Sequence, residues 1–381
     1  MELTMNAVLG DIQKSGIRVF TQMAKQEPGC LFLTLGEPDL DTPLSVREAA
    51  KASLDAGETH YPENNGQAFL RKAIADFECK KHGLSYTPDE VIVTVGATEA
   101  LFCALFGILN PGDEVIVPTP AFGLYESIIK LCRGVCVSLD TRDSAFQITT
   151  EKLRNAITPR TKAIILTSPN NPTGCIYTQE TLDIIHEAVK DLPVFVICDE
   201  VYRDLIYTDN FSSFTQFSDM RDRIIEVQSF SKPYAMTGWR VGYLLADAPV
   251  KAQLEKVHQY DVVSISSFVQ RACVEALAHD ISGELALYRR RRDYVCARLD
   301  KMGLSYFKPQ GAFYVFPSIA QFGMDSFTFC TRMVKEGKLA CTPGSCFGAE
   351  GYLRISYCYS DEVLREGMDR LQRFVQNSTA K

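Results

Sequence analysis

The stretch that decides the fold is VFVICDE at 194–200, followed after a polar interval by IIEVQSFSKPYAMTGWR at 224–240. Each segment starts as a continuously apolar run rich in Val and Ile, and each run ends in polar residues. Such runs are typical of parallel strands that are covered on both faces. The sequence therefore predicts a buried sheet with polar side chains at the strand ends.

Other runs of the same character occur along the first two thirds of the chain. They are EVIVTV (90–95), EVIVPT (114–119), KAIILTS (162–168) and VGYLLA (241–246). Helical patterns lie between them, for example at 98–109 and 178–190. Strands that alternate with helices predict a doubly wound α/β domain. Ligands of such domains bind at the C-terminal ends of the strands.

The pattern changes from about Phe268. A long helical stretch covers 270–280 and 284–303, short strand signals follow at 311–316 and 352–357, and a final helix is expected at 360–375. This order predicts a smaller α+β domain. The N-terminal segment up to Pro43 has no strong pattern, and we expect it to pack on the small domain.

Composition excludes several classes of protein. The chain has 381 residues, of which 46% are hydrophobic and 23% charged, as in soluble globular proteins of two domains. Its net charge of −7 argues against general affinity for nucleic acid or anionic membranes. The basic run at 289–292 lies in a helical stretch, and we expect it to form a solvated helix face.

The cysteines indicate a reducing, cytoplasmic location. The 13 cysteines are scattered and form no CxxC pair, and many lie in apolar runs, so we expect reduced thiols and no metal site. The N-terminus lacks the pattern of a signal peptide. No apolar stretch approaches the ~20 residues that span a bilayer.

Lys232 is the most informative residue. It follows a buried strand directly, and burial of an ammonium group is costly unless the amine is used, for example in a Schiff base. Ser229, Ser231 and Arg240 nearby are donors suited to a phosphate. The alternative for this segment alone is a surface lysine in an ordinary loop.

Two further strand ends carry polar groups. Asp199 ends the run 194–199 and needs a partner, such as a protonated pyridine nitrogen, unless it caps a helix. Tyr202 follows and can bond a ring oxygen or simply pack. Asn171, in the rigid turn SPNNPTG at 168–174, can present its amide to the same oxygen.

The segment Gly96-Ala97-Thr98 joins a strand to a helix. Free backbone N–H groups at a helix start bind anions, and glycine lets a phosphate approach closely. Arg354, on an otherwise apolar strand, suits a carboxylate, although a snorkelling role is the alternative. Phe122 can stack on an aromatic ring or pack in the core.

Taken together and in this order, these motifs resemble the class I/II aminotransferases, which depend on pyridoxal 5′-phosphate and have fold type I. The matching segments are SGIRVF (15–20), LGEPD (35–39), GAT (96–98), NPTG (171–174), DEVY (199–202), SFSK…TGWRVG (229–242), GAFYVF (311–316) and LRIS (353–356). The resemblance covers nearly the whole chain. Segments 256–270 and 322–327 are most similar to a bacterial branch that includes N-acetyl-diaminopimelate, aromatic and aspartate aminotransferases.

The resemblance implies a fold with a large domain, built on a mostly parallel seven-stranded sheet sandwiched by helices, and a small α+β domain. The expected divisions are an N-terminal segment (1–42), a large domain that binds the cofactor (43–280) and a small C-terminal domain (281–381). It also implies a homodimer with shared active sites.

The resemblance further implies roles residue by residue. Lys232 is expected to carry the cofactor, Asp199 to pair with the pyridine nitrogen, and Asn171 and Tyr202 to bond the ring oxygen. Phosphate contacts are expected from Gly96, Ala97, Thr98, Ser229, Ser231, Arg240 and, in the neighbouring subunit, Tyr61. Phe122 is expected to stack on the ring. Arg354 is expected to bind the substrate carboxylate with the Gly36 backbone and Asn171.

The activity implied is transfer of an amino group from an L-amino acid to a 2-oxo acid by a ping-pong mechanism. A carbon–sulfur β-lyase of the cystathionine type on the same scaffold is the nearest alternative. A non-catalytic regulator that binds the cofactor is disfavoured, because such proteins carry a DNA-binding domain ahead of this fold. Thr98 stands where some aspartate-specific relatives have lysine, which argues mildly against a strict aspartate enzyme.

Overall fold

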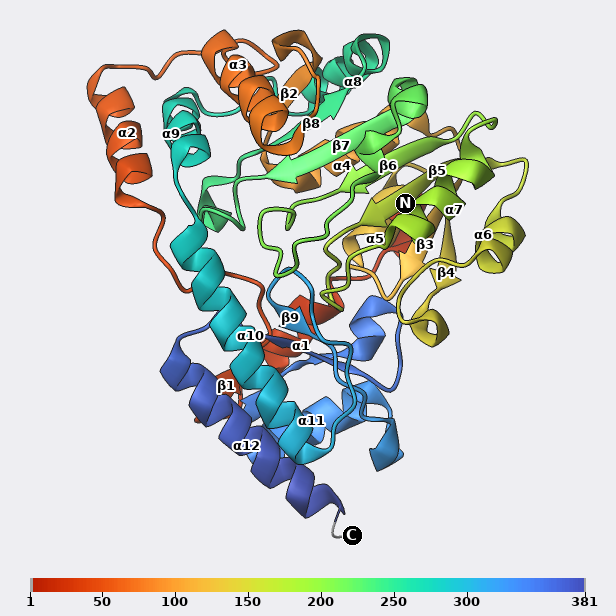
Figure 1. Cartoon of the computed structure of the whole chain (residues 1–381), viewed down its shortest axis with the longest axis vertical. Coiled ribbons are helices and arrows are strands. Elements are labelled where there is room, and N and C mark those ends of the chain that lie inside the picture. Colours follow the sequence, from red (N-terminus) through yellow and green to blue (C-terminus); the bar gives the residue numbers. More distant parts are fainter. Residues whose placement is uncertain (1–2, 380–381) are drawn as a thin grey trace.

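The computed structural model describes residues 3–379 (Figure 1). The first two and last two residues, at the outer ends of the predicted N-terminal segment and small domain, lie outside the described residues. A seven-stranded sheet with helices on both faces forms one part of the molecule, and a small domain forms the other. The predicted domain boundaries at 42/43 and 280/281 stay predictions.

The strands of the large sheet have the order β2-β8-β7-β6-β5-β3-β4. Their bounds are β2 (Val91–Thr94), β3 (Glu114–Thr119), β4 (Val135–Asp140), β5 (Thr161–Thr167), β6 (Phe195–Asp199), β7 (Ile224–Ser229) and β8 (Gly242–Ala246). Neighbours are parallel except that β8 is antiparallel to both β2 and β7. The mostly parallel sheet predicted from the sequence is confirmed.

The helices fall into two groups, those that cover the large sheet and those of the small domain and N-terminal segment. Their bounds are α1 (Gly16–Ala24), α2 (Leu44–Asp55), α3 (Ala68–Phe77), α4 (Gly96–Ile108), α5 (Leu124–Leu131), α6 (Thr150–Ala156), α7 (Gln179–Val189), α8 (Ala248–Asp261), α9 (Ser267–Ala278), α10 (Ser282–Met302), α11 (Ser326–Gly337) and α12 (Asp361–Thr379).

Both faces of the sheet are buried because successive side chains of each strand point in opposite directions. In β3, Val115 and Val117 pack with residues of α4, α5 and α8. Ile116, between them, packs on the other face with residues of α6 and α7. This double burial explains the continuously apolar runs.

Two strands differ from the sequence-based expectation. β4 was not predicted, because as an edge strand it is largely exposed or half-buried and lacks the apolar run. β8 was predicted to be a parallel strand and is antiparallel. A strand that is buried on both faces has the same composition in either direction, so the apolar run could not indicate its orientation.

The small domain is built on short strands. β9 (Tyr314–Val315), β12 (Leu353–Ser356) and β11 (Thr342–Pro343) form an antiparallel sheet. β1 (Leu31–Phe32) of the N-terminal segment pairs with β10 (Leu339–Ala340). In Figure 1, α10 extends from the end of α9 down to α12 and so connects the two parts.

The long helical stretch predicted after Phe268 is two helices, α9 and α10, interrupted at 279–281. The prediction that 289–292 form a solvated face is wrong for half of the run. Arg291 and Arg292 are buried, since the 3.6-residue period places them on the same face as Tyr288 and Val295. Arg291 forms two hydrogen bonds of 2.7 and 2.8 Å to Asp39, so its charge is paired rather than solvated.

Within residues 3–379, no helix is both long and apolar enough to cross a membrane. The 13 cysteines are free, and most of them are buried.

Candidate active site

The strand ends that carry the predicted polar residues meet at one edge of the large sheet. Because β8 is antiparallel to both of its neighbours, β2 points in the same direction as β5, β6 and β7. The turns that follow these four strands therefore lie at the same edge. The small domain and the segment at 34–37 close over this edge and contribute Tyr314, Arg354 and Gly36.

Lys232 lies in the turn that follows β7 and is half-buried. The Nζ atom donates a hydrogen bond of 2.6 Å to the backbone carbonyl of Gly36. Burial lowers the pKa of Lys232 to about 8, because the charged form loses its hydration. Roughly a tenth of this amine is therefore uncharged at pH 7, far more than for an exposed lysine, and an uncharged amine is a nucleophile.

Asp199 ends β6 and is 5% exposed. The hydroxyl of Tyr125 donates to its Oδ2 atom across 2.7 Å, and the backbone N–H of Val201 donates to Oδ1 across 3.4 Å. Burial raises the pKa of Asp199 to about 6, and the two hydrogen bonds act against that rise. A cation placed beside this carboxylate would stabilise its charged form.

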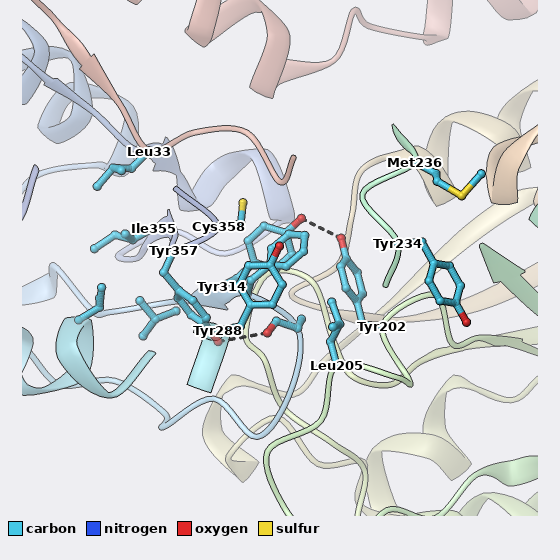
Figure 2. Packing of buried hydrophobic residues seen from close by; sticks show 14 of the residues in the cluster. Leu33, Tyr202, Leu205, Tyr234, Met236, Tyr288, Tyr314, Ile355, Tyr357 and Cys358 are labelled. Carbon is cyan, nitrogen blue, oxygen red and sulfur yellow. Dashed lines mark hydrogen bonds between the residues drawn. The ribbon is translucent and has the colours of Figure 1, made fainter. Parts of the chain in front are cut away.

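Tyr202 lies in the turn after Asp199 and points toward the small domain. Its hydroxyl is 2.7 Å from the hydroxyl of Tyr314, and Figure 2 shows the two groups facing each other. The Nζ atom of Lys232 lies 6.0 Å from the centroid of the Tyr202 ring. Tyr202 and the lysine therefore share one enclosed space.

Arg354, on β12, is 2% exposed and has an incomplete set of partners. It donates to Asn171 Oδ1 (2.8 Å) and to the carbonyl of Thr34 (2.5 Å). Its guanidinium carbon lies 4.4 Å from the centroid of the Tyr314 ring and 4.8 Å from that of Phe347. The buried Nε has no hydrogen-bond partner among the described residues. A buried guanidinium with no carboxylate partner is suited to an anion.

Gly96 begins α4 and has a φ of +73°. A Cβ atom at this position would lie 2.7 Å from Nη2 of Arg240, so only glycine fits there without displacing the guanidinium. Arg240 donates to the carbonyl of Thr237 across 2.9 Å and is otherwise exposed. The helix N-terminus and this guanidinium together form a strongly electropositive corner.

The structure brings the other predicted residues toward Lys232 to different extents. Ser229 and Ser231 are buried beside Lys232, and Ser229 Oγ accepts a hydrogen bond of 3.1 Å from the Ser231 N–H. Phe122 is half-buried, and its ring meets that of Tyr125 edge to face at 6.4 Å.

Ala97 and Thr98 follow Gly96 in the first turn of α4, half-buried and exposed respectively. Tyr61 is 91% exposed, and among the described residues it forms no hydrogen bond to the groups around Lys232 in the same chain.

Sequence reasoning missed several residues that complete this site. They are Thr34, Tyr125, Thr167, Tyr314 and Phe347. Thr167 is the last residue of β5, and its hydroxyl donates to Tyr125 across 2.8 Å. A polar residue at that strand end was a usable signal. Tyr125 and Phe347 gave none, because their patterns match ordinary core positions.

Known proteins match this chain along nearly its whole length. The model of the family described as aminotransferase class I and II matches residues 28–371. A probable N-acetyl-LL-diaminopimelate aminotransferase of Bacillus subtilis is 41% identical, over 98% of this chain and 96% of its own. An aromatic-amino-acid aminotransferase of Thermococcus litoralis is 36% identical, over 96% of each chain.

A solved structure has the same fold. The aspartate aminotransferase of Thermus thermophilus, determined with maleate, superposes with a TM-score of 0.93 at 34% identity, over 98% of this chain and all of that one. The fold and the sheet edge thus define a fold type I enzyme. The chain belongs to the class I and II aminotransferase family, and it is an aminotransferase.

Proposed function

We propose that this aminotransferase uses pyridoxal 5′-phosphate carried on Lys232 to move an amino group from an L-amino acid to a 2-oxo acid such as 2-oxoglutarate, in a ping-pong cycle. The observation that carries the proposal is the position of the Lys232 amine at the C-terminal edge of the sheet, 2.6 Å from the Gly36 carbonyl and 6.0 Å from the centroid of the Tyr202 ring. The amine lies in the space that Tyr202 and Arg354 also border.

The residues at the sheet edge fit the cofactor in three respects. The corner between Gly96 and Arg240 offers a cation and helix N–H groups to a phosphate, in a space that a Cβ atom would fill. Asp199 is a buried carboxylate without a cationic partner in the part of the chain that the structure describes, as a pyridinium nitrogen requires. The third is the nucleophilic amine of Lys232.

When bound, the cofactor supplies an aldehyde that binds amines covalently and a ring that takes up electrons. Lys232 would hold the cofactor and would move a proton away from the substrate Cα and back. Asp199 would stabilise a positive charge on the ring nitrogen. Tyr202 and Asn171 would offer donors to the ring oxygen, and Phe122 would offer its ring for stacking.

Arg354 is proposed to bind the α-carboxylate of the substrate. Its position is fixed by Asn171, Thr34 and two aromatic rings, so it meets the carboxylate without reorganisation. The donor is proposed to be an aromatic amino acid, aspartate or a related compound, because the matched relatives are named for such substrates.

The enzyme is proposed to be a cytoplasmic homodimer. Tyr61 and Tyr260 are 91% and 87% exposed, which is unusual for large aromatic side chains and supports burial of this surface by a second copy. In that dimer Tyr61 is proposed to reach the phosphate of the neighbouring subunit. The free cysteines agree with a reducing compartment.

The test is an absorbance spectrum of the purified protein, followed by single amino acids with and without 2-oxoglutarate. A yellow band that one class of amino acid bleaches, and that 2-oxoglutarate restores, supports transamination and names the donor. Release of ammonia and pyruvate from cystathionine without an acceptor would favour the β-lyase. No band after addition of pyridoxal phosphate would refute the role of Lys232.

A further inference from the structure

A buried ion pair lies directly behind the electropositive corner at Gly96. His258 of α8 is fully buried, and Glu99 of α4 is 7% exposed. The Nδ1 atom of His258 is 2.6 Å from Glu99 Oε1, and its Nε2 atom is 2.6 Å from the backbone carbonyl of Asn64.

The hydrogen bonds around His258 define its charge. A carbonyl oxygen only accepts, so Nε2 carries a hydrogen. Glu99 accepts from the Val95 N–H at Oε2 and from the thiol of Cys103 at Oε1, as a carboxylate does. With Glu99 ionised, Nδ1 donates as well, and the ring is then an imidazolium.

The pKa of His258 agrees with that assignment. Burial is the largest single influence and lowers the pKa, but the hydrogen bond and charge of Glu99, the Asn64 carbonyl and the charge of Glu255 together raise it above its ordinary value. Glu99, Cys103 and His258 place ligand atoms within 4.8 Å of one another, the spacing of a metal site. Both imidazole nitrogens are already engaged as donors, so the cluster is better described as an ion pair.

One end of this ion pair holds the phosphate-binding turn. Glu99 Oε2 accepts from the backbone N–H of Val95 across 2.5 Å, and Val95 directly precedes Gly96. A carboxylate at this helix start would repel a phosphate bound at the same N-terminus. The imidazolium cancels that charge.

The other end holds the segment 61–66, which begins with Tyr61. His258 binds this segment at Asn64, while the Asn65 carbonyl accepts from Val93 (3.0 Å) and the Gly66 carbonyl from Arg71 (2.9 Å). The exposed Tyr61 therefore lies at the start of a segment whose backbone His258 helps to hold in place.

We propose that His258 is a positioning residue. As a buried imidazolium it neutralises Glu99 behind the phosphate-binding turn and anchors the Tyr61 segment. Phosphate binding in one active site and the donation of Tyr61 to the other then depend on the same ion pair. The proposal rests on the cofactor and the dimer of the proposed function.

The test measures the dissociation constant of pyridoxal phosphate by absorbance titration of protein freed of cofactor. His258→Gln leaves the Glu99 charge uncompensated and is expected to weaken binding roughly tenfold, as loss of a buried charged hydrogen bond does. The double variant Glu99→Gln/His258→Gln removes both charges and is expected to regain most of the affinity. His186→Gln is the control, since His186 of α7 forms a 2.7 Å pair with Asp219 away from the site.

The link to the segment is tested with Tyr61→Phe. Its cost in cofactor affinity is expected to be smaller in the His258→Gln background than in the wild type, because the segment is then already misplaced. If His258→Gln does not fold, as judged by circular dichroism, the same comparison is made in the double variant.

The outcomes are distinguishable. The role of His258 in neutralising Glu99 would be overturned by wild-type affinity for pyridoxal phosphate in His258→Gln. It would also be overturned if the double variant bound pyridoxal phosphate no more tightly than His258→Gln. An equal cost of Tyr61→Phe in both backgrounds would overturn the link to the segment. Failure of the wild type itself to bind pyridoxal phosphate would instead overturn the proposed function.

Discussion

Replacement of Tyr125 by phenylalanine tests the hydrogen bond between Tyr125 and Asp199. The variant loses the hydroxyl that donates to Asp199 Oδ2 across 2.7 Å and leaves the carboxylate with the 3.4 Å bond from Val201. A hydrogen bond to a charged group contributes about 1.5–3 kcal/mol. This corresponds to a rise of roughly 1–2 pH units in the pKa of Asp199 relative to the wild type in the same state. The pKa is about 6 with no cation beside the carboxylate, and it lies lower when a pyridinium nitrogen is bound there.

The sign follows from which form of Asp199 is active. Only the carboxylate can hold a positive charge on the ring nitrogen. A raised pKa of Asp199 therefore lowers the fraction of active enzyme at the acidic end of the pH range. The acidic limb of kcat/KM, measured from pH 5 to 9, is expected to move to higher pH by about one unit or more. Thr167 also loses its acceptor, so the melting temperature is measured in parallel.

The control variant is Tyr243→Phe, which removes a buried phenol that donates to Glu78 across 2.5 Å. It is expected to lower stability without displacing the acidic limb. If Tyr125→Phe keeps the wild-type limb, or if Tyr243→Phe moves it equally, the reasoning about Asp199 is refuted.

Other substitutions probe the remaining parts of the site. Lys232→Ala is expected to abolish turnover, and activity of this variant without added amines would contradict the assignment. In the wild type, the rate at which pyridoxal phosphate attaches to cofactor-free protein should increase as the pH rises toward about 8, where the amine loses its proton. Arg354→Lys replaces a guanidinium that can form two parallel hydrogen bonds by a single ammonium. The amino acid should then bind about 2 kcal/mol more weakly, so its KM should rise roughly thirtyfold while the yellow band stays unchanged. An unchanged KM would remove Arg354 from the substrate site. Gly96→Ala places a Cβ atom 2.7 Å from Arg240 at a positive φ and should weaken cofactor binding at least tenfold by absorbance titration, whereas Gly238→Ala, which meets nothing within 4 Å, should not.

The edge of the large sheet shows where sequence reasoning succeeds. Apolar runs marked β6 and β7, and the polar residues after them pointed to Asp199 and Lys232. Parallel strands bring their C-terminal ends together, so residues far apart in sequence were expected to meet. The sequence pattern singled out Arg354 as a group suited to an anion, and the family resemblance connected this small-domain residue to that edge.

Other features depended on contacts that a linear pattern does not contain. The exposed edge strand β4 has no apolar run, and β8 gives no sign of its direction. Arg291 is charged and yet buried, because Asp39, from a distant segment, lies opposite it.

The sequence by itself determined the doubly wound sheet, the polar strand ends and the family, because burial on both faces and a rigid order of motifs leave direct traces in residue type and spacing. Only the tertiary structure decided the partners of those groups. The Tyr125 hydroxyl on Asp199, the Tyr314 ring under Arg354 and the His258 imidazolium on Glu99 join residues that are 74, 40 and 159 positions apart. A tyrosine or histidine that packs in a core has the same local pattern whether or not its polar atom meets a charge, since that meeting depends on the three-dimensional path of the chain.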